Sequence, residues 1–337
     1  EENQMTITPF ILGRGMAGQA FQKSLAILSL QHPDWGLQET LPLSRNQKPE
    51  ISSKTPNPVL FIANPHGLHA SSILEGEKAG FKAILVEKPA CVNLKEIESL
   101  KSVRIPVAVC HGYHQMWGPQ TLKQMLDAGE FGELISIEGH YWQSSAAQKA
   151  LEPSPKPHPW KNDPDLSGGS DALIDIGIHW ADTAAFLMGD LTFKGTAWLS
   201  YANAEAPHRD THVHLNLEFS GGRRALGSIS KTFHGAANDF EVTLIGTRQS
   251  AAWNFMEPDG IWLGRGGSRT FLPRKESILG SQQPPFHALG WLEGYIEITR
   301  RLLLELQGQG GGNYPRLEGN LQVLESLFKL ETIRQKK

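Results

Sequence analysis

The chain has 337 residues, of which 39% are hydrophobic and 20% are charged, a balance typical of globular proteins with room for about two domains. Its formal net charge of −3 provides no basic surface for nucleic acid or for an anionic membrane. No apolar run approaches the roughly 18 residues that a membrane span needs. We therefore expect neither nucleic acid nor a membrane as a partner.

The two cysteines, Cys91 and Cys110, are too few for a disulfide framework and have no metal-ligand spacing. Each adjoins an apolar run, so we expect two small core residues and no metal site. The chain starts with an acidic, polar segment instead of the basic and then apolar start of a signal peptide. These features favour a reducing, cytoplasmic setting.

Apolar runs alternate with helical stretches over residues 5–115. The runs cover 6–12, 37–45, 58–64, 82–88 and 105–113, and the helical stretches cover 19–30, 71–80 and 94–103. Alternation of strands with helices predicts an α/β fold with a doubly wound parallel sheet, the Rossmann arrangement. We expect this first domain to span residues 1–117.

From about residue 133 the pattern changes to strands with a period of two. Such strands are predicted at 133–142, 211–219, 223–233, 239–246 and 249–255. This periodicity indicates a large, mostly antiparallel sheet with one covered face and one open face. Helical stretches at 289–306 and 320–333 follow. We therefore expect a second, α+β domain over 118–337, in which a proline-rich loop at 151–160 is long enough to be a lid or a substrate-side loop.

Gly13, Gly15 and Gly18 form a G-x-G-x-x-G pattern between the first predicted strand and the first helix. In a dinucleotide site the first glycine permits a tight turn, the second lets the backbone approach the pyrophosphate, and the third allows close helix packing. The helix N-terminus attracts the phosphates. A purely structural turn is the alternative. We favour an NAD(P) site formed by Gly13, Arg14, Gly15, Met16, Ala17 and Gly18.

The end of the second apolar run selects between the two nicotinamide dinucleotides. An NAD site typically has an Asp or Glu there, which binds the ribose 2′-OH. This chain has Ser44 and Arg45 and no carboxylate. A hydroxyl and a guanidinium suit a 2′-phosphate, so the sequence favours NADP, with NAD as the alternative. The competing interpretation is that Arg45 is an ordinary solvated loop residue.

Polar residues follow the third and fourth predicted strands, where parallel α/β sheets bind their ligands. One strand ends in Asn64 and the other in Glu87 and Lys88, which Pro89 follows. Pro89 restricts the backbone of Lys88 to extended conformations and thereby its direction. A surface Glu–Lys pair is the alternative. On the cofactor side we expect Asn64, Pro65, His69, Glu87 and Lys88.

Asp175 and His179 are four residues apart in the apolar stretch 172–188 and would share one face of a helix. A carboxylate beside an imidazole holds its tautomer and raises its basicity, which suits proton abstraction. A metal site is the rival use of these residue types, but no further ligand stands at suitable spacing. A structural histidine is the other alternative.

These motifs together resemble the glucose–fructose oxidoreductase / inositol dehydrogenase (Gfo/Idh/MocA) family over nearly the whole chain. The resemblance rests on the glycine loop at 13–18, the segment 64–93 with its E-K-P motif, the segment 109–137, and the D-x-G-x-H motif within 168–189. Met116 stands where many members have an arginine, and Asn64 where they have threonine or a small residue. These departures bear on the shape of the substrate.

The resemblance implies reversible oxidation of a hydroxyl group on a sugar or cyclitol with NAD or NADP. It also implies a homodimer or homotetramer that forms through the open face of the sheet. Carried over, Lys88 contacts the nicotinamide and the substrate hydroxyl, and His179 accepts or donates the hydroxyl proton. The expected catalytic residues are thus Lys88, Asp175 and His179. The expected substrate-binding residues are His114, Trp160, Lys161, Asp175 and His179.

Two functions of other classes stay open on this sequence. One is a glycoside hydrolase that retains its NAD, which would cleave a chromogenic glycoside without a net change in NAD(P)H. The other is a non-catalytic sensor of sugar or cofactor. The joint presence of Lys88, Asp175 and His179 favours an enzyme, because a sensor needs no proton-transfer set.

Overall fold

The computed structural model describes residues 6–44, 47–48, 50–152, 159–201, 209–276 and 287–335. The chain divides into two compact units, of which unit 1 comprises Glu1–Gln115 and Trp291–Leu321 and unit 2 comprises Met116–Gly290 and Gln322–Lys337. The helical stretch near 289–306, which the sequence places with the second domain, thus lies largely in unit 1. The domain bounds 1–117 and 118–337 stay a prediction.

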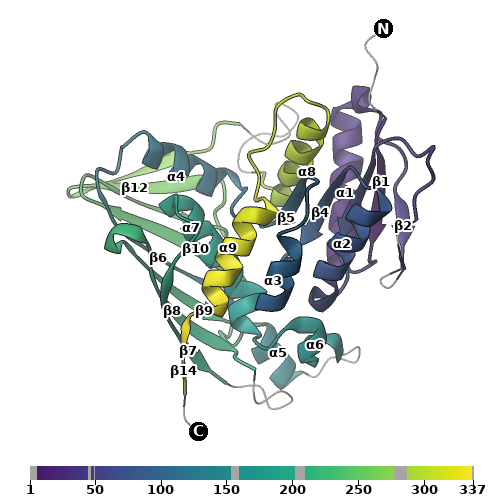
Figure 1. Ribbon diagram of the computed structural model, residues 1–337. Helices are drawn as coiled ribbons and strands as arrows, with labels where there is room; N and C mark the ends of the chain where they lie inside the picture. The colour runs from purple at the N-terminus through teal and green to yellow at the C-terminus, as the bar shows by residue number, and fades with distance from the viewer. Residues whose placement is uncertain are drawn as a thin grey trace. The chain divides into compact units, whose positions relative to one another are not determined.

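Unit 1 is a parallel sheet with helices on both faces (Figure 1). Its elements are β1 (Thr8–Leu12), α1 (Met16–Gln31), β2 (Leu41–Leu43), β3 (Pro58–Ile62), α2 (His69–Ala79), β4 (Ala83–Glu87), α3 (Leu94–Leu100), β5 (Val107–Cys110) and α8 (Leu292–Leu306). The strand order is β2-β1-β3-β4-β5. The chain runs from β1 to β2 at one edge and from β3 through β4 to β5 at the other, and α1 packs with α8 while α2 packs with α3.

Four of the five strands in this sheet have no solvent face, the exception being the edge strand β2. Every residue of β1, β3, β4 and β5 is buried, which explains why the sequence shows continuous apolar runs here in place of alternation. Cys91 and Cys110 are buried free thiols within this core. The strand order reverses between β1 and β3, and the loops that follow these two strands meet at the carboxyl edge of the sheet. The predicted doubly wound fold is confirmed.

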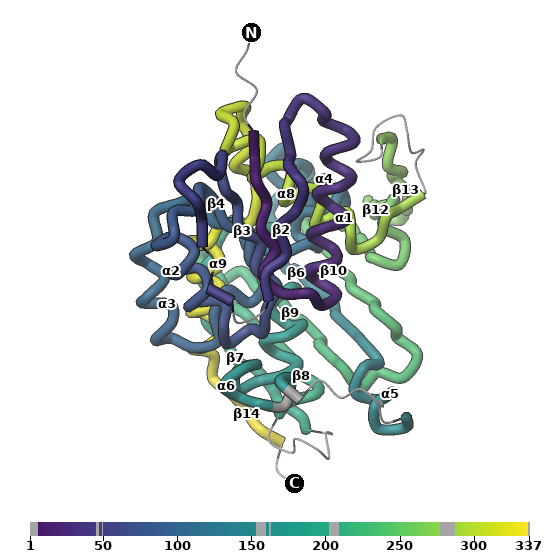
Figure 2. The backbone as a smooth tube through the Cα atoms, turned by 90° about the vertical axis from the view of Figure 1, so that its right-hand side faces the viewer, coloured from purple at the N-terminus to yellow at the C-terminus, as the bar shows by residue number. Residues whose placement is uncertain are grey.

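Unit 2 is built on a sheet that has nine strands within the described ranges, in the order β13-β12-β11-β10-β6-β9-β8-β7-β14. Figures 1 and 2 show β12 and β14 toward opposite edges of this sheet. Two pairs, β6–β9 and β7–β14, are parallel and the others are antiparallel. Its strands are β6 (Leu134–Gln143), β7 (Lys194–Ser200), β8 (His212–Glu218), β9 (Arg224–Ser230), β10 (Asn238–Gly246), β11 (Ser250–Asn254), β12 (Gly260–Arg265), β13 (Ser268–Pro273) and β14 (Glu331–Arg334).

The helices of unit 2 are α4 (Trp117–Asp127), α5 (Ser145–Leu151), α6 (Pro164–Ser167) and α7 (Ile178–Met188), and α9 (Leu317–Phe328) contains the last boundary between the units. The helix expected over 320–333 ends at Phe328, and the chain then adds β14 beside β7. This edge strand depends on long-range backbone pairing, which a local pattern does not reveal. Every helix in the described part of the chain is too short or too polar to cross a bilayer.

Trp180 seats α7 on the covered face of the sheet. Its side chain is fully buried, and its indole N–H donates to the carbonyl oxygen of Glu241 on β10 at 3.2 Å. A Cβ at Gly227 on β9 would lie 2.7 Å from the indole ring, and one at Gly139 on β6 would lie 2.9 Å from the indole nitrogen. Glycine at these two positions therefore lets the helix approach the strands closely enough to hold Trp180.

The opposite face of the same sheet is open, as the alternation predicts. Trp198 on β7 and Leu226 on β9 are 56% and 43% exposed, whereas their neighbours along each strand are buried or half-buried. His212 and His214 lie on this face of β8, with their Nε2 atoms 3.0 Å apart. The face therefore combines aromatic, aliphatic and imidazole side chains.

Candidate active site

The glycine loop joins β1 to α1 at the carboxyl edge of the parallel sheet. Gly13 has a φ of +107°, and a Cβ there would lie 2.4 Å from the carbonyl oxygen of Ala63. A Cβ on Gly18 would lie 2.3 Å from the carbonyl oxygen of Gly13. A Cβ on Gly15 would meet nothing within 4 Å. The first and third glycines are thus required by the packing of unit 1 itself, whereas the second borders open space.

The N-terminus of α1 faces this open space with no competing anion of its own. The helix has no capping side chain and no acidic residue in its first turn. Arg14, Gly15 and Met16 are exposed, and Ala17 is half-buried. The amide groups of a first helical turn have no intrahelical partner and carry partial positive charge. The loop and helix therefore fit a pyrophosphate that approaches at Gly15.

The loop after β2 lies directly beside the glycine loop. The N–H of Gly13 donates to the carbonyl oxygen of Leu43, the last residue of β2, at 3.2 Å. Ser44 follows β2 and has an exposed side chain. Its backbone N–H donates to Oε1 of Gln47 at 3.1 Å. Arg45, the second residue expected to favour NADP, lies outside the described residues.

The buried side chain of His69 connects the loops that follow β3 and β4. The ring is completely buried, with Nε2 2.8 Å from the carbonyl oxygen of Asn64 and Nδ1 2.7 Å from that of Pro89. The side-chain amide of Asn64 donates to Oγ of Ser72 at 3.0 Å. His69 thus joins the loop after β3, which continues into the buried Pro65, to the loop after β4. Its contribution to cofactor binding stays a prediction.

The E-K-P segment ends β4 with one buried and one half-buried charge. Glu87 accepts a hydrogen bond from the hydroxyl of Tyr295 on α8, and burial raises the pKa of the Glu87 carboxyl. Lys88 is half-buried and precedes a cis peptide bond to Pro89. Glu87 therefore anchors the end of β4 to α8, while Lys88 lies at the carboxyl edge of the sheet, as the sequence predicts.

In unit 2 the Asp–His pair lies where two helical forms meet. Asp175 belongs to a π-helical turn, Ala172–Gly177, which continues directly into α7 with His179 in its first turn. Both side chains are half-buried. The His179 ring is 5.9 Å from the ring of Tyr141 on β6, measured between centroids. The spacing correctly predicts a shared helical segment, but it gives no sign of the π turn, a feature that recurs at functional sites.

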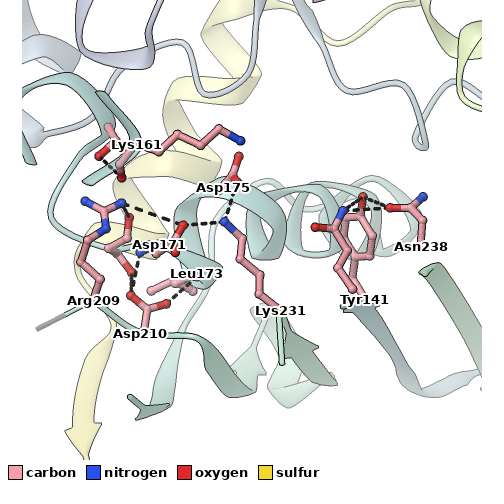
Figure 3. A network of polar contacts seen from close by, with 12 residues as sticks. Tyr141, Lys161, Asp171, Leu173, Asp175, Arg209, Asp210, Lys231 and Asn238 are labelled. Carbon is pink, nitrogen blue, oxygen red and sulfur yellow. Dashed lines mark hydrogen bonds and ion pairs between the residues drawn. The ribbon is translucent and has the colours of Figure 1, made fainter. Parts of the chain in front are cut away.

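Lys231 follows the end of β9 and holds the carboxylate of Asp175 (Figure 3). Its Nζ donates to Oδ2 of Asp175 at 2.6 Å and to Oδ1 of Asp171 at 2.5 Å. Burial lowers the pKa of Lys231, but the two carboxylates outweigh burial and raise the pKa above its usual value. The ammonium is therefore charged throughout the working pH range of the folded protein.

Arg209 and Asp210, which precede β8, support the segment before the π turn. Oδ1 of Asp210 accepts the backbone N–H of Asp171 at 2.8 Å. Arg209 donates to the carbonyl oxygens of Gly168 at 2.6 Å and Ser170 at 3.0 Å. These contacts fix the backbone from which the side chains of Asp171 and Asp175 extend.

Sequence reasoning missed Lys231, although its position carries a signal. Ala225 and Ile229 are core-facing residues of β9, and Lys231 occupies the next position in that alternation. A lysine on the covered face of a sheet needs a buried anionic partner. The partners Asp171 and Asp175 are 60 and 56 residues away, so local spacing does not identify them.

The remaining predicted substrate residues lie in both units. His114 is half-buried in the segment of unit 1 that follows β5, and Trp160 and Lys161 are half-buried in the short 3-10 turn Pro159–Asn162 of unit 2. Nζ of Lys161 is 5.6 Å from the centroid of the Trp160 ring. Their contact with substrate stays a prediction. Among the residues that the structure describes, no group of three or more His, Cys, Asp or Glu side chains is arranged to hold a metal ion.

Residues 120–252 match the sequence model of the family described as GFO/IDH/MocA C-terminal domain. The chain is 28% identical over 195 residues to D-xylose 1-dehydrogenase [NADP(+)] of Haloarcula marismortui, a match that covers 56% of this chain and 51% of that protein. It is 26% identical over 300 residues to levoglucosan dehydrogenase of Pseudarthrobacter phenanthrenivorans, covering 79% of this chain and 75% of the relative. The chain thus spans about half the length of the first of these relatives and three quarters of the second.

The fold also matches solved structures along nearly its whole length. An inositol dehydrogenase homolog from Azotobacter vinelandii, solved as a complex with NAD+, superposes with a TM-score of 0.80 over 97% of this chain and 95% of its own. The sequence identity is 18%, so this likeness shows a shared fold.

We expect His69→Gln to flatten the acid side of the stability curve. Burial lowers the pKa of His69 from 6.5 to about 4. The hydrogen bonds to the carbonyl oxygens of Pro89 and Asn64 raise the pKa, but by less than burial lowers it. Between these values the unfolded chain binds a proton that the folded chain does not bind. The free energy of unfolding of the wild type should therefore fall by up to about 3 kcal/mol as the pH decreases through this window.

Urea unfolding at several pH values between 6.5 and 4 measures this effect. His114→Gln is the matched control, because His114 is half-buried and lies in the same unit. Parallel curves for the wild type and His69→Gln would show that folding does not lower the pKa of His69.

Proposed function

We propose that the chain is a member of the Gfo/Idh/MocA family and an NAD(P)-dependent oxidoreductase acting on a CH–OH group of a sugar, cyclitol or related polyhydroxylated molecule. The observation that carries the proposal is the glycine loop, which leaves open space at Gly15 beside an uncapped helix N-terminus. The substrate class is supported by the relatives named as xylose and levoglucosan dehydrogenases.

NADP is the cofactor that we propose, with NAD as the alternative. Ser44 offers an exposed hydroxyl at the end of β2, next to the glycine loop, and Arg45 follows it. One relative is named for NADP(+), whereas the inositol dehydrogenase homolog was solved with NAD+. The missing carboxylate at the end of β2 is the feature that favours the 2′-phosphate.

The catalytic roles follow from the chemistry of three side chains. The bound nicotinamide supplies the hydride acceptor or donor. In the direction of oxidation, Lys88 donates a hydrogen bond to the substrate hydroxyl oxygen and stabilises the negative charge that develops there. His179 takes the hydroxyl proton. Asp175 accepts hydrogen bonds from the substrate through the carboxylate that Lys231 binds.

A homo-oligomer that forms through the open face of the unit 2 sheet belongs to the same proposal. Trp198 and Leu226 are large apolar side chains exposed on that face. Large apolar side chains exposed on one face of a sheet favour an interface there.

Replacement of Gly15 by alanine should weaken dinucleotide binding by at least about tenfold with little loss of stability. The φ of −74° and ψ of −169° at this residue suit alanine, and its methyl group would meet no protein atom. It would occupy the space through which a phosphate approaches the loop. Fluorescence titration with NAD(P)H and thermal unfolding measure the two quantities.

Gly13→Ala is the contrasting variant. Its φ of +107° and the nearby carbonyl of Ala63 should make it destabilising by more than about 1 kcal/mol. Unchanged dinucleotide affinity in Gly15→Ala would place the cofactor elsewhere.

Lys88→Ala should lower kcat by about 100- to 1,000-fold while leaving NAD(P)H affinity nearly unchanged, because the lost ammonium acts on charge that develops during the reaction. A screen of sugars and inositols, monitored at the nicotinamide absorbance, identifies a substrate for this measurement. Lys82→Ala is the control, since Lys82 is exposed and precedes the other end of β4. Release of aglycone from a chromogenic glycoside without net NAD(P)H change would overturn the dehydrogenase proposal in favour of a hydrolase.

Arg45→Ala should weaken NADP binding far more than NAD binding, because the lost guanidinium interacts with the 2′-phosphate alone. Parallel titrations with the two dinucleotides provide the comparison. Lys48→Ala, at an exposed lysine of the same loop, serves as the control for a general loss of positive charge. Equal losses for NADP and NAD in Arg45→Ala would show that the 2′-phosphate is not bound there.

A further inference from the structure

The cluster Asp171–Asp175–Lys231, drawn in Figure 3, contains three charged side chains that differ in exposure. The side chain of Lys231 is 7% exposed, whereas those of Asp171 and Asp175 are 20% and 22% exposed. Solvent, and any small molecule that reaches this face of unit 2, therefore meets the carboxylates more readily than the ammonium. Lys231 is placed to act through Asp175 and not by direct contact with substrate.

The backbone of Lys231 is fixed on both sides. Its N–H donates to the carbonyl oxygen of Thr211 at 2.8 Å, and its own carbonyl oxygen accepts the N–H of Ala146 at 2.8 Å and that of Ala147 at 3.3 Å. The residue is therefore tied to the segment before β8 and to the start of α5. Because the Cα is held and the side chain is enclosed, the ammonium has little freedom, and neither does the carboxylate that it binds.

The two carboxylates are a repulsive pair on their own segment. The N–H of Asp175 donates to the carbonyl oxygen of Asp171 at 2.8 Å, so the residues are one helical turn apart. Like charges at this spacing destabilise each other, and close carboxylates titrate as a coupled pair. Lys231 lies within 2.6 Å of both, and its charge allows both to be ionised at once.

We propose that Lys231 is a positioning residue of the active site, which keeps Asp175 ionised and aimed while it also neutralises Asp171. Without the ammonium, the mutual repulsion of Asp171 and Asp175 would let the pair take up a proton at a higher pH, and a protonated Asp175 would no longer be a pure acceptor. An ionised Asp175 can accept hydrogen bonds from a substrate hydroxyl or an imidazole, and a protonated carboxyl does so far less well. The kinetic part of this inference rests on the proposed function, whereas the protonation part does not.

Lys231→Met tests the protonation directly. Methionine is close to lysine in length and shape and carries no charge. With aspartate carboxyl groups labelled with ¹³C and the Asp175 signal identified by Asp175→Asn, we expect the pair in Lys231→Met to take up a proton at least about one pH unit higher than in the wild type. Lys231→Arg keeps the charge and should titrate like the wild type.

Arg209→Met is the matched control, because Arg209 is a buried cation beside the same cluster. Its guanidinium binds the carbonyl oxygens of Gly168 and Ser170 and lies 4.0 Å from Asp171. This variant should lose stability, and its carboxyl titration should move much less than in Lys231→Met, because Arg209 lies farther from the pair than Lys231 does. A wild-type titration in folded Lys231→Met would overturn the proposal.

The pH dependence of kcat/KM gives the kinetic readout. In Lys231→Met the acidic limb should move to higher pH by about the same one unit or more as the carboxyl titration, and the activity lost on the acid side should recover as the pH rises. NAD(P)H affinity should not change, because the glycine loop belongs to the other unit. A uniform loss at all pH values, with the limb in its wild-type place, would indicate a structural role only and would overturn the proposal.

Asp171→Asn decides the matter if Lys231→Met does not fold. It keeps the cation and removes the competing anion, so both the titration of Asp175 and the acidic limb should move to lower pH. A shift to higher pH, or none, would contradict the proposal. A wild-type chain that turns over no polyol with either dinucleotide would contradict the proposed function, and the carboxyl titrations would then decide the role of Lys231 on their own.

Discussion

The arrangement of the site in unit 2 depends on one packing contact, the indole of Trp180 over Gly139 and Gly227. This contact fixes both the distance of α7 from the sheet and its rotation about its own axis. His179 is the adjacent residue, and Asp175 lies in the preceding π turn. Protein interiors have no slack that would absorb even one methyl group here. A helix displaced outward would carry Asp175 away from the ammonium of Lys231.

The two units build their polar groups by different means. In unit 1 the main chain provides most of the polar groups of the proposed cofactor site. The glycines let backbone segments approach each other closely, and the N-terminus of α1 faces open space. In unit 2 the proposed functional groups are side chains, and the carboxylate of Asp175 is held by the ammonium of Lys231. A site formed by backbone groups tolerates substitution of the neighbouring side chains, provided that the glycines are kept. A site made of coupled charges depends on every member.

The sequence predicted the features that local pattern controls. Buried runs revealed the parallel strands, alternation revealed the open sheet, and the glycine spacing located a loop that the structure confirms as a tight turn. It missed what depends on distant partners: the pairing of β14 with β7, the attachment of α8 to unit 1, and the ion pair between Lys231 and Asp175. The π turn also escaped, because its wider winding leaves no mark on the four-residue spacing of Asp175 and His179.

The return of the chain to unit 1 has a consequence for how such proteins can be recombined. A gene fragment that stops after β5 would lack α8, the partner of α1, and would leave the acid at the tip of β4 without the phenol of Tyr295. A chimera that borrows this nucleotide-binding unit from a relative therefore needs two crossover points, one on each side of the inserted sheet domain. Exchange at a single junction would combine β1–β5 of one protein with α8 of another, and the contacts between α1 and α8 would then be mismatched.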